Sequence, residues 1–418
     1  MSGRWSHRNH PEAIRRRQEM VRSLPYWQDQ DEIIFDWGVD PEQLKKYHEG
    51  FTGQMIFPVS IVGPMAISMG QYHVDGVDNV DQVIRQDDKV FVPLVHTEGG
   101  LSASMQRGIH AMNSSGGVYT QIISDVMTRD CAFVFASTSA AYALRKWLMA
   151  HRVLLQEWIN DPNHPGKHTT LPTVSSHARL LDIQAIVVGP ACHVLYQFYP
   201  GEACGPNMIT RNAYALNQEI LNRMPAKMDL PQHIYLEANL GGDKKPSYQY
   251  YHGGHGKTVN AHVTLNDVQL QRYLNISPEA LERLEWVGLH GSHASGMQSF
   301  GFTPASAIAA IFAATGQDLG MVATSSMAHA TIYREGDSVD FSIELSGVEV
   351  GTIGGGTSLP HAQSYLRMMG CEGPGSAQRL AQIIGGATLA LELSAASAMA
   401  SRGSENFFRA HLERGGMR

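Results

Sequence analysis

The sequence predicts an α+β fold that contains a sandwich of the ferredoxin type. Strand-like, helical, strand-like, strand-like and helical patterns follow one another over about 100 residues, between residues 117 and 224. The GxGxxG fingerprint that follows the first strand of a Rossmann fold is absent, so any dinucleotide site is of another kind. Further along, the alanine-rich segment 304–315 predicts a helix that packs closely against its neighbours.

The first hundred residues predict two helices and then strands. Residues 11–24 form a charged helical pattern that begins near a proline, and residues 41–48 indicate a second, short helix. From Phe57 the apolar run FPVSIVGPMAI is typical of a buried strand and a turn. An apolar strand at 90–95 ends at the segment 96–98, a pair of glycines then turns the chain, and residues 101–107 have a helical pattern.

The ferredoxin-like region begins with residues 117–136, which alternate as strands around Asp125–Asp130 and place Arg129 at a strand end. Its other segments are an amphipathic helix, two strands around a Gly-Pro turn, and a glycine-containing loop that opens a helix: residues 139–160, 174–200 and 201–224. Free backbone N–H groups at the start of that last helix would suit an anion or a nucleotide.

The second half of the chain mixes strands and helices. Strands are predicted at 256–268 and 338–353, and helices at 278–286, 304–315 and 376–400. The polar, glycine-tipped tail at 401–418 is expected to be a mobile segment.

Composition indicates a globular protein in a reducing compartment. The 418 residues suffice for two or more domains, with 43% hydrophobic and 17% charged residues. The net charge of -7 gives no reason to expect nucleic acid. Four cysteines lack zinc or redox spacing. No uninterrupted run of about 18 apolar residues predicts a membrane span, and the basic N-terminus lacks the apolar core of a secretory signal. We expect a soluble cytoplasmic protein.

The loop Leu236–Pro246, LEANLGGDKKP, has two interpretations. Gly241 and Gly242 permit a tight turn, and Pro246 prevents easy continuation as a helix. An Asp-Lys-Lys run usually faces water, so the local sequence favours a solvated turn. The alternative is a loop that aims one lysine as an immobile positive charge, which would stabilise an oxyanion.

Four polar groups stand out because each is bordered by glycine or by a chain end: Glu98, Lys244, Asp318 and His411. Glu98 lies at a strand-to-helix junction, where it is either a catalytic acid or an N-terminal acid favoured by the helix dipole. Two carboxyl groups, an ammonium and an imidazole suit a reaction that builds an oxyanion and protonates a leaving group. Spacing alone does not show that they meet.

The stretch His252–His255 resembles a metal motif only superficially. Two histidines flank two glycines, but no carboxylate or cysteine accompanies them in the local sequence. A polar turn is the better interpretation, and we expect no metal.

Motifs along most of the chain resemble, in order, those of hydroxymethylglutaryl-CoA reductases, namely the soluble catalytic part of the eukaryotic and archaeal type. The matching stretches are FPVSIVGPM, HTEGGLSASMQRG, SDVMTRD, SSHARL, GEACGPNMIT, NLGGDKKP, ATGQD, GVEVGTIGGGTSLPHAQSYLRMMG and RAHL. So many matches in one order are hard to explain by chance.

The resemblance implies a domain arrangement. A large acyl-CoA-binding domain would contain an inserted, smaller, ferredoxin-like domain for NAD(P), preceded by a helical segment and followed by a tail that carries a catalytic histidine. The corresponding ranges are 51–130 with 236–400, 131–235, 1–50 and 401–418. The family further implies a homodimer, or a higher homo-oligomer, with active sites at the subunit interface.

The resemblance also implies the chemistry: NAD(P)H-dependent, four-electron reduction of hydroxymethylglutaryl-CoA to mevalonate and free CoA. Lys244 would stabilise the oxyanion, and His411 would protonate the departing CoA thiolate. Glu98 would supply a proton at the aldehyde stage, with Asp318 linking it to Lys244.

Further residues carry binding roles by the same resemblance. Arg129 corresponds to the arginine that grips the acyl carboxylate, and Arg107 to one near CoA. Asn239, Glu237 and Ser306 complete the implied acyl pocket. The implied cofactor residues are Ser175, Ser176, Glu202, Gly205, Asn207, Met208, Gly354 and Gly355.

Two departures from the family pattern bear on specificity. Ser176 stands where the family has an arginine that helps to hold the NADPH 2′-phosphate, while Glu202 could accept a ribose 2′-hydroxyl, so NADH stays open beside NADPH. Glu237 stands where the family has serine and adds a carboxylate near the acyl group. Reduction of a different acyl-CoA or carrier-bound thioester, and a non-catalytic binding homologue, are the alternatives.

Overall fold

The computed structural model describes most of the chain in two compact units. The described residues are 10–23, 28, 29, 32, 35, 36, 38–44, 48–72, 87–161, 175 and 177–414. One unit comprises residues 1–59 with 95–97, and the other comprises residues 60–94 with 98–418. Each is described by itself.

The N-terminal unit contains helix α1 (Pro11–Arg22) and the 3-10 helix η2 (Pro41–Leu44). The α1 helix is not solvated all round, because Arg17 is buried and its Nε donates to the Phe51 carbonyl at 3.1 Å. The prediction of a helix at 41–48 is met only by the short 3-10 turn; residues 45–47 lie outside the described part.

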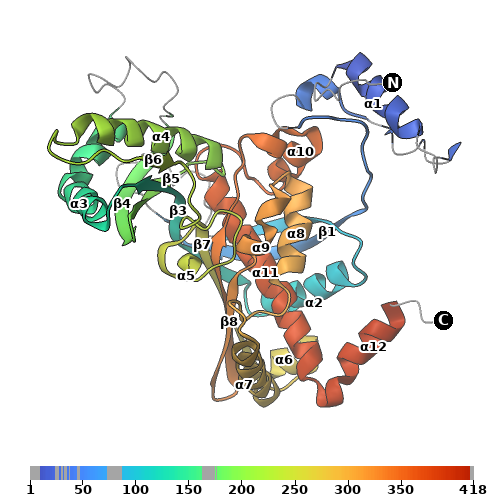
Figure 1. The fold of residues 1–418 in the computed structure, drawn as a ribbon. Coiled ribbons are helices and arrows are strands. Elements are labelled where there is room, and N and C mark those ends of the chain that lie inside the picture. Colours follow the sequence, from blue (N-terminus) through green and yellow to red (C-terminus); the bar gives the residue numbers. More distant parts are fainter. Residues whose placement is uncertain are drawn as a thin grey trace. The chain divides into compact units, whose positions relative to one another are not determined.

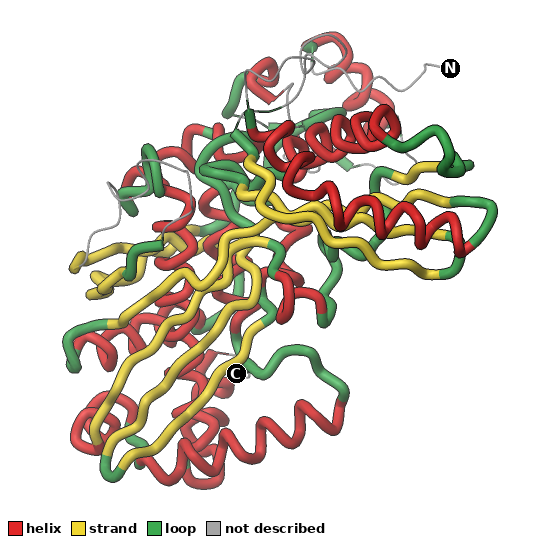
Figure 2. The backbone as a smooth tube through the Cα atoms, turned by 90° about the vertical axis from the view of Figure 1, so that its left-hand side faces the viewer, coloured by secondary structure: helices red, strands yellow, loops and turns green. Residues whose placement is uncertain are grey.

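The larger unit contains a sheet with strand order β2-β1-β3-β7-β9-β8. Its strands are β1 (Val59–Met69), β2 (Asp87–Val95), β3 (Val118–Val134), β7 (Gly256–Asn266), β8 (Ala328–Glu335) and β9 (Ser338–Val348). The β1–β3 pair is parallel, whereas β3–β7, β7–β9 and β8–β9 are antiparallel. Figure 2 shows the strands as long, twisted runs side by side.

Helices pack on this sheet around one apolar cluster. They are α2 (Leu101–Asn113), α6 (Asp267–Leu274), α7 (Pro278–Ser295), α8 (Pro304–Thr315), α10 (Pro360–Met368) and α11 (Ser376–Ala400). Among the described helices, α11 alone is long and apolar enough to cross a membrane, but 78% of its most apolar window is buried within the protein. It is therefore the central core helix (Figure 1).

A second apolar cluster lies within the ferredoxin-like part. Its elements follow the order β3, α3 (Thr138–Asn160), β4 (Arg179–Val188), β5 (Ala191–Tyr199), α4 (Pro206–Arg223) and β6 (His233–Tyr235). The strands pair antiparallel in the order β4-β5-β3-β6, and α3 and α4 pack on this sheet (Figure 1). The predicted ferredoxin-type sandwich is confirmed.

Strand β3 belongs to both sheets. Residues 118–126 pair with β1 and β7, and residues 127–134 pair with β5 and β6. The prediction that Arg129 ends a strand is wrong, because β3 is one strand of 17 residues and Arg129 lies in its interior. Buried Asp125 and Asp130 do not break the strand, since their side chains find partners on other elements.

Several short elements gave no clear sequence signal. They are α5 (Gln249–Gly253), η4 (Leu319–Met321), α9 (Val322–Ser325), η5 (Gly355–Ser358), η6 (Arg402–Ser404) and α12 (Glu405–Arg414), together with β6, β8, α6 and α10. The α6 helix begins at a capping box between Asn266 and Gln269. The tail thus contains a helix within 401–414; its mobility stays a prediction.

A buried ion pair joins the two central strands. Lys257 on β7 donates to Asp125 on β3 at 2.9 Å, and the two side chains are 1% and 0% exposed. Replacing Lys257 with Met would leave a buried carboxylate without its cation. We expect the free energy of unfolding to fall by about 3–5 kcal/mol, as measured by urea denaturation. The double variant Asp125→Leu/Lys257→Met should recover most of that loss, and an undiminished loss would contradict this account.

Candidate active site

The loop Leu236–Pro246 is tightly turned and pinned to β3. Asn239, Gly242 and Lys244 have φ values of 69°, 77° and 57°, in the left-handed region. The Leu240 N–H donates to Asp130 Oδ2 at 3.0 Å, and the Thr128 hydroxyl donates to the Gly241 carbonyl at 2.7 Å. A side chain at Gly242 would meet the ring of Tyr250. The loop is therefore a fixed platform for Lys244.

The Lys244 ammonium lies 2.6 Å from Asp318 Oδ2. Asp318 follows α8, and its Oδ1 accepts from the Gly320 N–H at 2.9 Å. Both side chains are about half exposed, so substrate can reach the ammonium. Two of the four predicted groups, from sites far apart in sequence, thus meet.

The ion pair shifts both pKa values. The hydrogen bond with Asp318 raises the pKa of Lys244, while burial opposes it. Burial by itself would raise the pKa of Asp318, but the hydrogen bonds from Lys244 and the Gly320 N–H outweigh it and lower that pKa. The pair therefore stays charged over a wide pH range around neutrality.

The structure describes the side chain of only one of the other two predicted groups. Glu98 lies in the turn between β2 and α2, is exposed, and has no hydrogen bond or ion pair with another described residue. His411 lies on α12, and its side chain is outside the described part.

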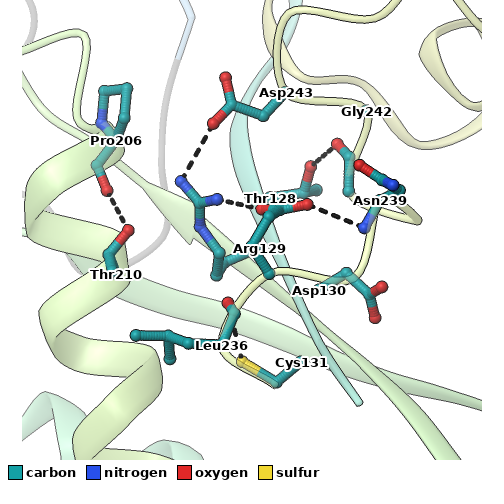
Figure 3. Close-up of polar contacts among 12 residues, drawn as sticks. Thr128, Arg129, Asp130, Cys131, Pro206, Thr210, Leu236, Asn239, Gly242 and Asp243 are labelled. Atoms are coloured by element: carbon teal, nitrogen blue, oxygen red, sulfur yellow. Dashed lines mark hydrogen bonds and ion pairs between the residues drawn. The ribbon is translucent and has the colours of Figure 1, made fainter.

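Arg129 is held between two carboxylates. Its guanidinium forms an ion pair with Glu237. A second ion pair, 3.2 Å long, joins it to Asp243 (Figure 3). The Arg129 side chain is 7% exposed, whereas that of Glu237 is 35% exposed. Arg129, on β3, is thus tied to the Lys244 loop through these carboxylates, and its charge is already neutralised by the protein.

Sequence reasoning missed a cluster beside this loop. His255, just before β7, lies with its Nε2 3.3 Å from Oε2 of Glu349, which follows β9. A carboxylate oxygen of Asp243 lies within 4.8 Å of the side-chain atoms of both residues. Local sequence could not reveal these partners because the two carboxylates come from other segments of the chain.

Three of the implied cofactor residues, Glu202, Gly205 and Gly354, lie in two adjoining loops. Gly205, with φ 101°, precedes α4, and the loop before it forms a bridge from Ala203 to Ile353 beside Gly354. Glu202 accepts hydrogen bonds from the Gly375 and Ala377 N–H groups at 2.6 and 2.7 Å. The Glu202 carboxylate therefore caps the N-terminus of α11. A ribose hydroxyl that donates to Glu202 would have to share this carboxylate with the backbone N–H groups of the helix.

The remaining predicted residues are spread around the unit. Arg107 on α2 donates from Nε to the Ser394 hydroxyl of α11 at 3.0 Å. Ser306 lies in the first turn of α8. The Ser175 N–H donates to Asn212 on α4 at 2.9 Å. Asn207, Met208 and Gly355 lie in α4 and η5, and Ser176 is outside the described residues.

Comparison with known proteins decides the family. The model of the family described as hydroxymethylglutaryl-coenzyme A reductase matches residues 13–415. The chain belongs to this family. The 3-hydroxy-3-methylglutaryl-coenzyme A reductase of Pyrococcus abyssi is 30% identical over 387 residues, which cover 90% of this chain and 87% of that protein. The reductase of Aeropyrum pernix is 33% identical over 378 residues, covering 88% and 82%.

The relatives extend beyond archaea. Reductase 2 of Arabidopsis thaliana is 31% identical over 359 residues, which cover 84% of this chain and 58% of the plant protein. Among solved structures, the class II reductase of Streptococcus pneumoniae bound to NADPH has a TM-score of 0.64 at 17% identity, covering 94% of this chain and 98% of that one. The latter similarity concerns the fold.

The pKa of Asp318 tests the geometry of the pair without substrate. In Lys244→Met the ammonium is lost while the burial of Asp318 remains, so the pKa of Asp318 should rise above that in the wild-type chain. An NMR titration of the carboxyl groups in aspartate-labelled protein would measure it. Lys245→Met is the matched control, because the Lys245 ammonium contacts the Asp243 carbonyl instead. An unchanged Asp318 pKa in Lys244→Met would contradict the ion pair.

Proposed function

We propose that this chain reduces hydroxymethylglutaryl-CoA to mevalonate and free CoA with two equivalents of NAD(P)H. Membership of the reductase family supports the reaction class. The Lys244–Asp318 pair carries the proposal for the site, because it holds an accessible ammonium on a rigid loop where an oxyanion can be stabilised.

The reaction reduces one carbonyl carbon twice. Bound nicotinamide cofactor supplies a hydride at each reduction. Lys244 stabilises the oxyanion of the hemithioacetal through its ammonium group. When the carbon–sulfur bond breaks, the CoA thiolate takes a proton from His411. The aldehyde oxygen then takes a proton from Glu98 as the alcohol forms.

Two of these roles fall on groups outside the Lys244–Asp318 ion pair. Glu98 is exposed and has no hydrogen bond or ion pair with another described residue, so its carboxyl group is available to give a proton to bound substrate. His411 lies on α12, and the tail that carries it would act as a lid that excludes water. Asp318 acts through Lys244, which it positions and keeps protonated.

The cofactor would bind at the start of α4. Free N–H groups of the first turn, at Asn207 and Met208, suit a phosphate group, and Gly205, Gly354 and Gly355 let the backbone approach it. Because Ser176 replaces an arginine of the family pattern, we propose that NADH competes with NADPH. We further propose a cytoplasmic homodimer in which CoA binds near Arg107.

Lys244→Ala should abolish turnover while leaving the fold intact, because the half-exposed side chain contributes little to stability. The measurement is oxidation of NADPH or NADH by absorbance, with hydroxymethylglutaryl-CoA as substrate and circular dichroism as the check on folding. Lys245→Ala is the matched control and should keep near-normal activity. Comparable activity in both variants would reject Lys244 as the oxyanion partner.

The Arg129–Glu237 ion pair favours a second candidate, reduction of a different acyl thioester. Arg129 faces two carboxylates, so the three groups together carry one excess negative charge. To bind Arg129, an acyl group with its own free carboxylate must either displace Glu237 or add a further negative charge to the three groups. An uncharged acyl group, on a CoA or a carrier, would not face this cost.

Replacing Glu237 distinguishes the two substrates. If hydroxymethylglutaryl-CoA is the substrate, Glu237→Ser should lower its KM about tenfold with little change in kcat, because Arg129 becomes free for the acyl carboxylate. Steady-state kinetics with this substrate and with a thioester lacking the carboxylate would measure it. Faster wild-type turnover of the uncharged thioester would support the second candidate. An unchanged KM in Glu237→Ser would exclude competition by Glu237.

A further inference from the structure

Three side chains from separate segments converge beside the Lys244 loop. Asp243 lies on the loop, His255 immediately precedes β7, and Glu349 immediately follows β9. One oxygen or nitrogen ligand atom from each lies within 4.8 Å of the other two. The cluster does not include Lys244 or Asp318, and no proton transfer of the proposed reaction passes through it, although Asp243 also pairs with Arg129.

The atoms that face one another lack hydrogen-bond partners. His255 and Glu349 are 1% and 0% exposed in their side chains. Asp243 Oδ1, His255 Nε2 and Glu349 Oε2 are all buried, and none has a hydrogen-bond partner among the described residues. Unsatisfied polar atoms at this depth cost free energy, and three in one place call for a common partner.

Each ligand is held from behind by a different contact. The other oxygen of Asp243 accepts from Arg129 at 3.2 Å. The other oxygen of Glu349 accepts from the hydroxyl of Tyr250 at 3.1 Å and from that of Thr324. These contacts orient the free atoms toward one another, as the supporting shell of a metal site does.

His255 is held through its other ring nitrogen by Thr128 on β3. The Thr128 N–H donates to His255 Nδ1 at 3.2 Å, and the Thr128 hydroxyl oxygen lies 2.6 Å from the same nitrogen. These contacts turn Nε2 toward Glu349, whose Oε2 lies 3.3 Å away. A metal ion bound to Nε2 would take the place of a proton there, because a ligating imidazole is neutral.

Because two carboxylates from other segments join His255, we propose, against the expectation of no metal from the sequence, that Asp243, His255 and Glu349 bind one divalent transition-metal ion of the Zn²⁺ class. Two carboxylates and one imidazole are a donor set that suits Zn²⁺, which binds such atoms at about 2.0–2.2 Å. Two atoms bound to one ion lie at most about 4.4 Å apart at those distances, so binding would draw the cluster slightly together. The ion would neutralise buried carboxylates and fasten the Lys244 loop to β7 and β9.

The test is direct metal binding to the full-length chain after removal of metal with a chelator. Isothermal titration with Zn²⁺ alone should show one saturable site per chain, and the melting temperature should rise on loading. Mg²⁺, which prefers oxygen ligands and retains water, should produce neither effect. Absence of a one-to-one Zn²⁺ site would overturn the proposal and leave a proton on Nε2 as the occupant.

Variants separate this site from surface histidines. Asp243→Asn and Glu349→Gln should each weaken Zn²⁺ binding about tenfold or more. Asp243 is partly exposed, so its variant tests the site even if Glu349→Gln fails to fold. His262→Ala is the matched control, because His262 and Asp340 form a half-exposed pair 3.4 Å apart. Zn²⁺ binding that survives Asp243→Asn but is lost in His262→Ala would place the ion on the surface and refute the proposal.

Discussion

The continuity of β3 is the constraint on which the site depends. One strand passes from the larger sheet into the ferredoxin-like sheet, so its middle residues contact both. In that middle part, Thr128 and Asp130 bind the backbone of the Lys244 loop. Arg129, between them, forms an ion pair with Asp243 of the same loop. Because a strand directs alternate side chains to opposite faces, neighbouring residues can hold different parts of the loop at once.

Ion pairs with the rest of the protein hold the loop in place. Arg129 and Lys244 each pair with carboxylates supplied by the protein, and the latter pairing sets the pKa of both partners. A preorganised ammonium needs no reorganisation when an oxyanion forms, which is the main physical source of such stabilisation. Glu237 matters for the same reason. It forms an ion pair with Arg129, the cation that an acyl carboxylate would need.

Long, strongly patterned segments were predictable from the sequence. The α8 and α11 helices begin and end where their apolar patterns do, and the order of elements in the ferredoxin-like part was correct. Short elements such as α6 and β8 were not predicted, because their apolar periodicity extends over too few residues. The polar middle of β3 was misinterpreted as a break, since partners such as Lys257 and His193 are distant in sequence.

The sequence by itself determined the fold class, the family resemblance and the residue types of the site. The motifs and their order identify Glu98, Lys244, Asp318 and His411. The glycines of the Lys244 loop predict its tight turn. Only the tertiary structure decided which of these meet: it joins Lys244 with Asp318 and shows no hydrogen bond or ion pair of Glu98 with either. It also gave His255 two carboxylate neighbours. Such contacts depend on sheet pairing and packing between distant segments, and no local pattern records them.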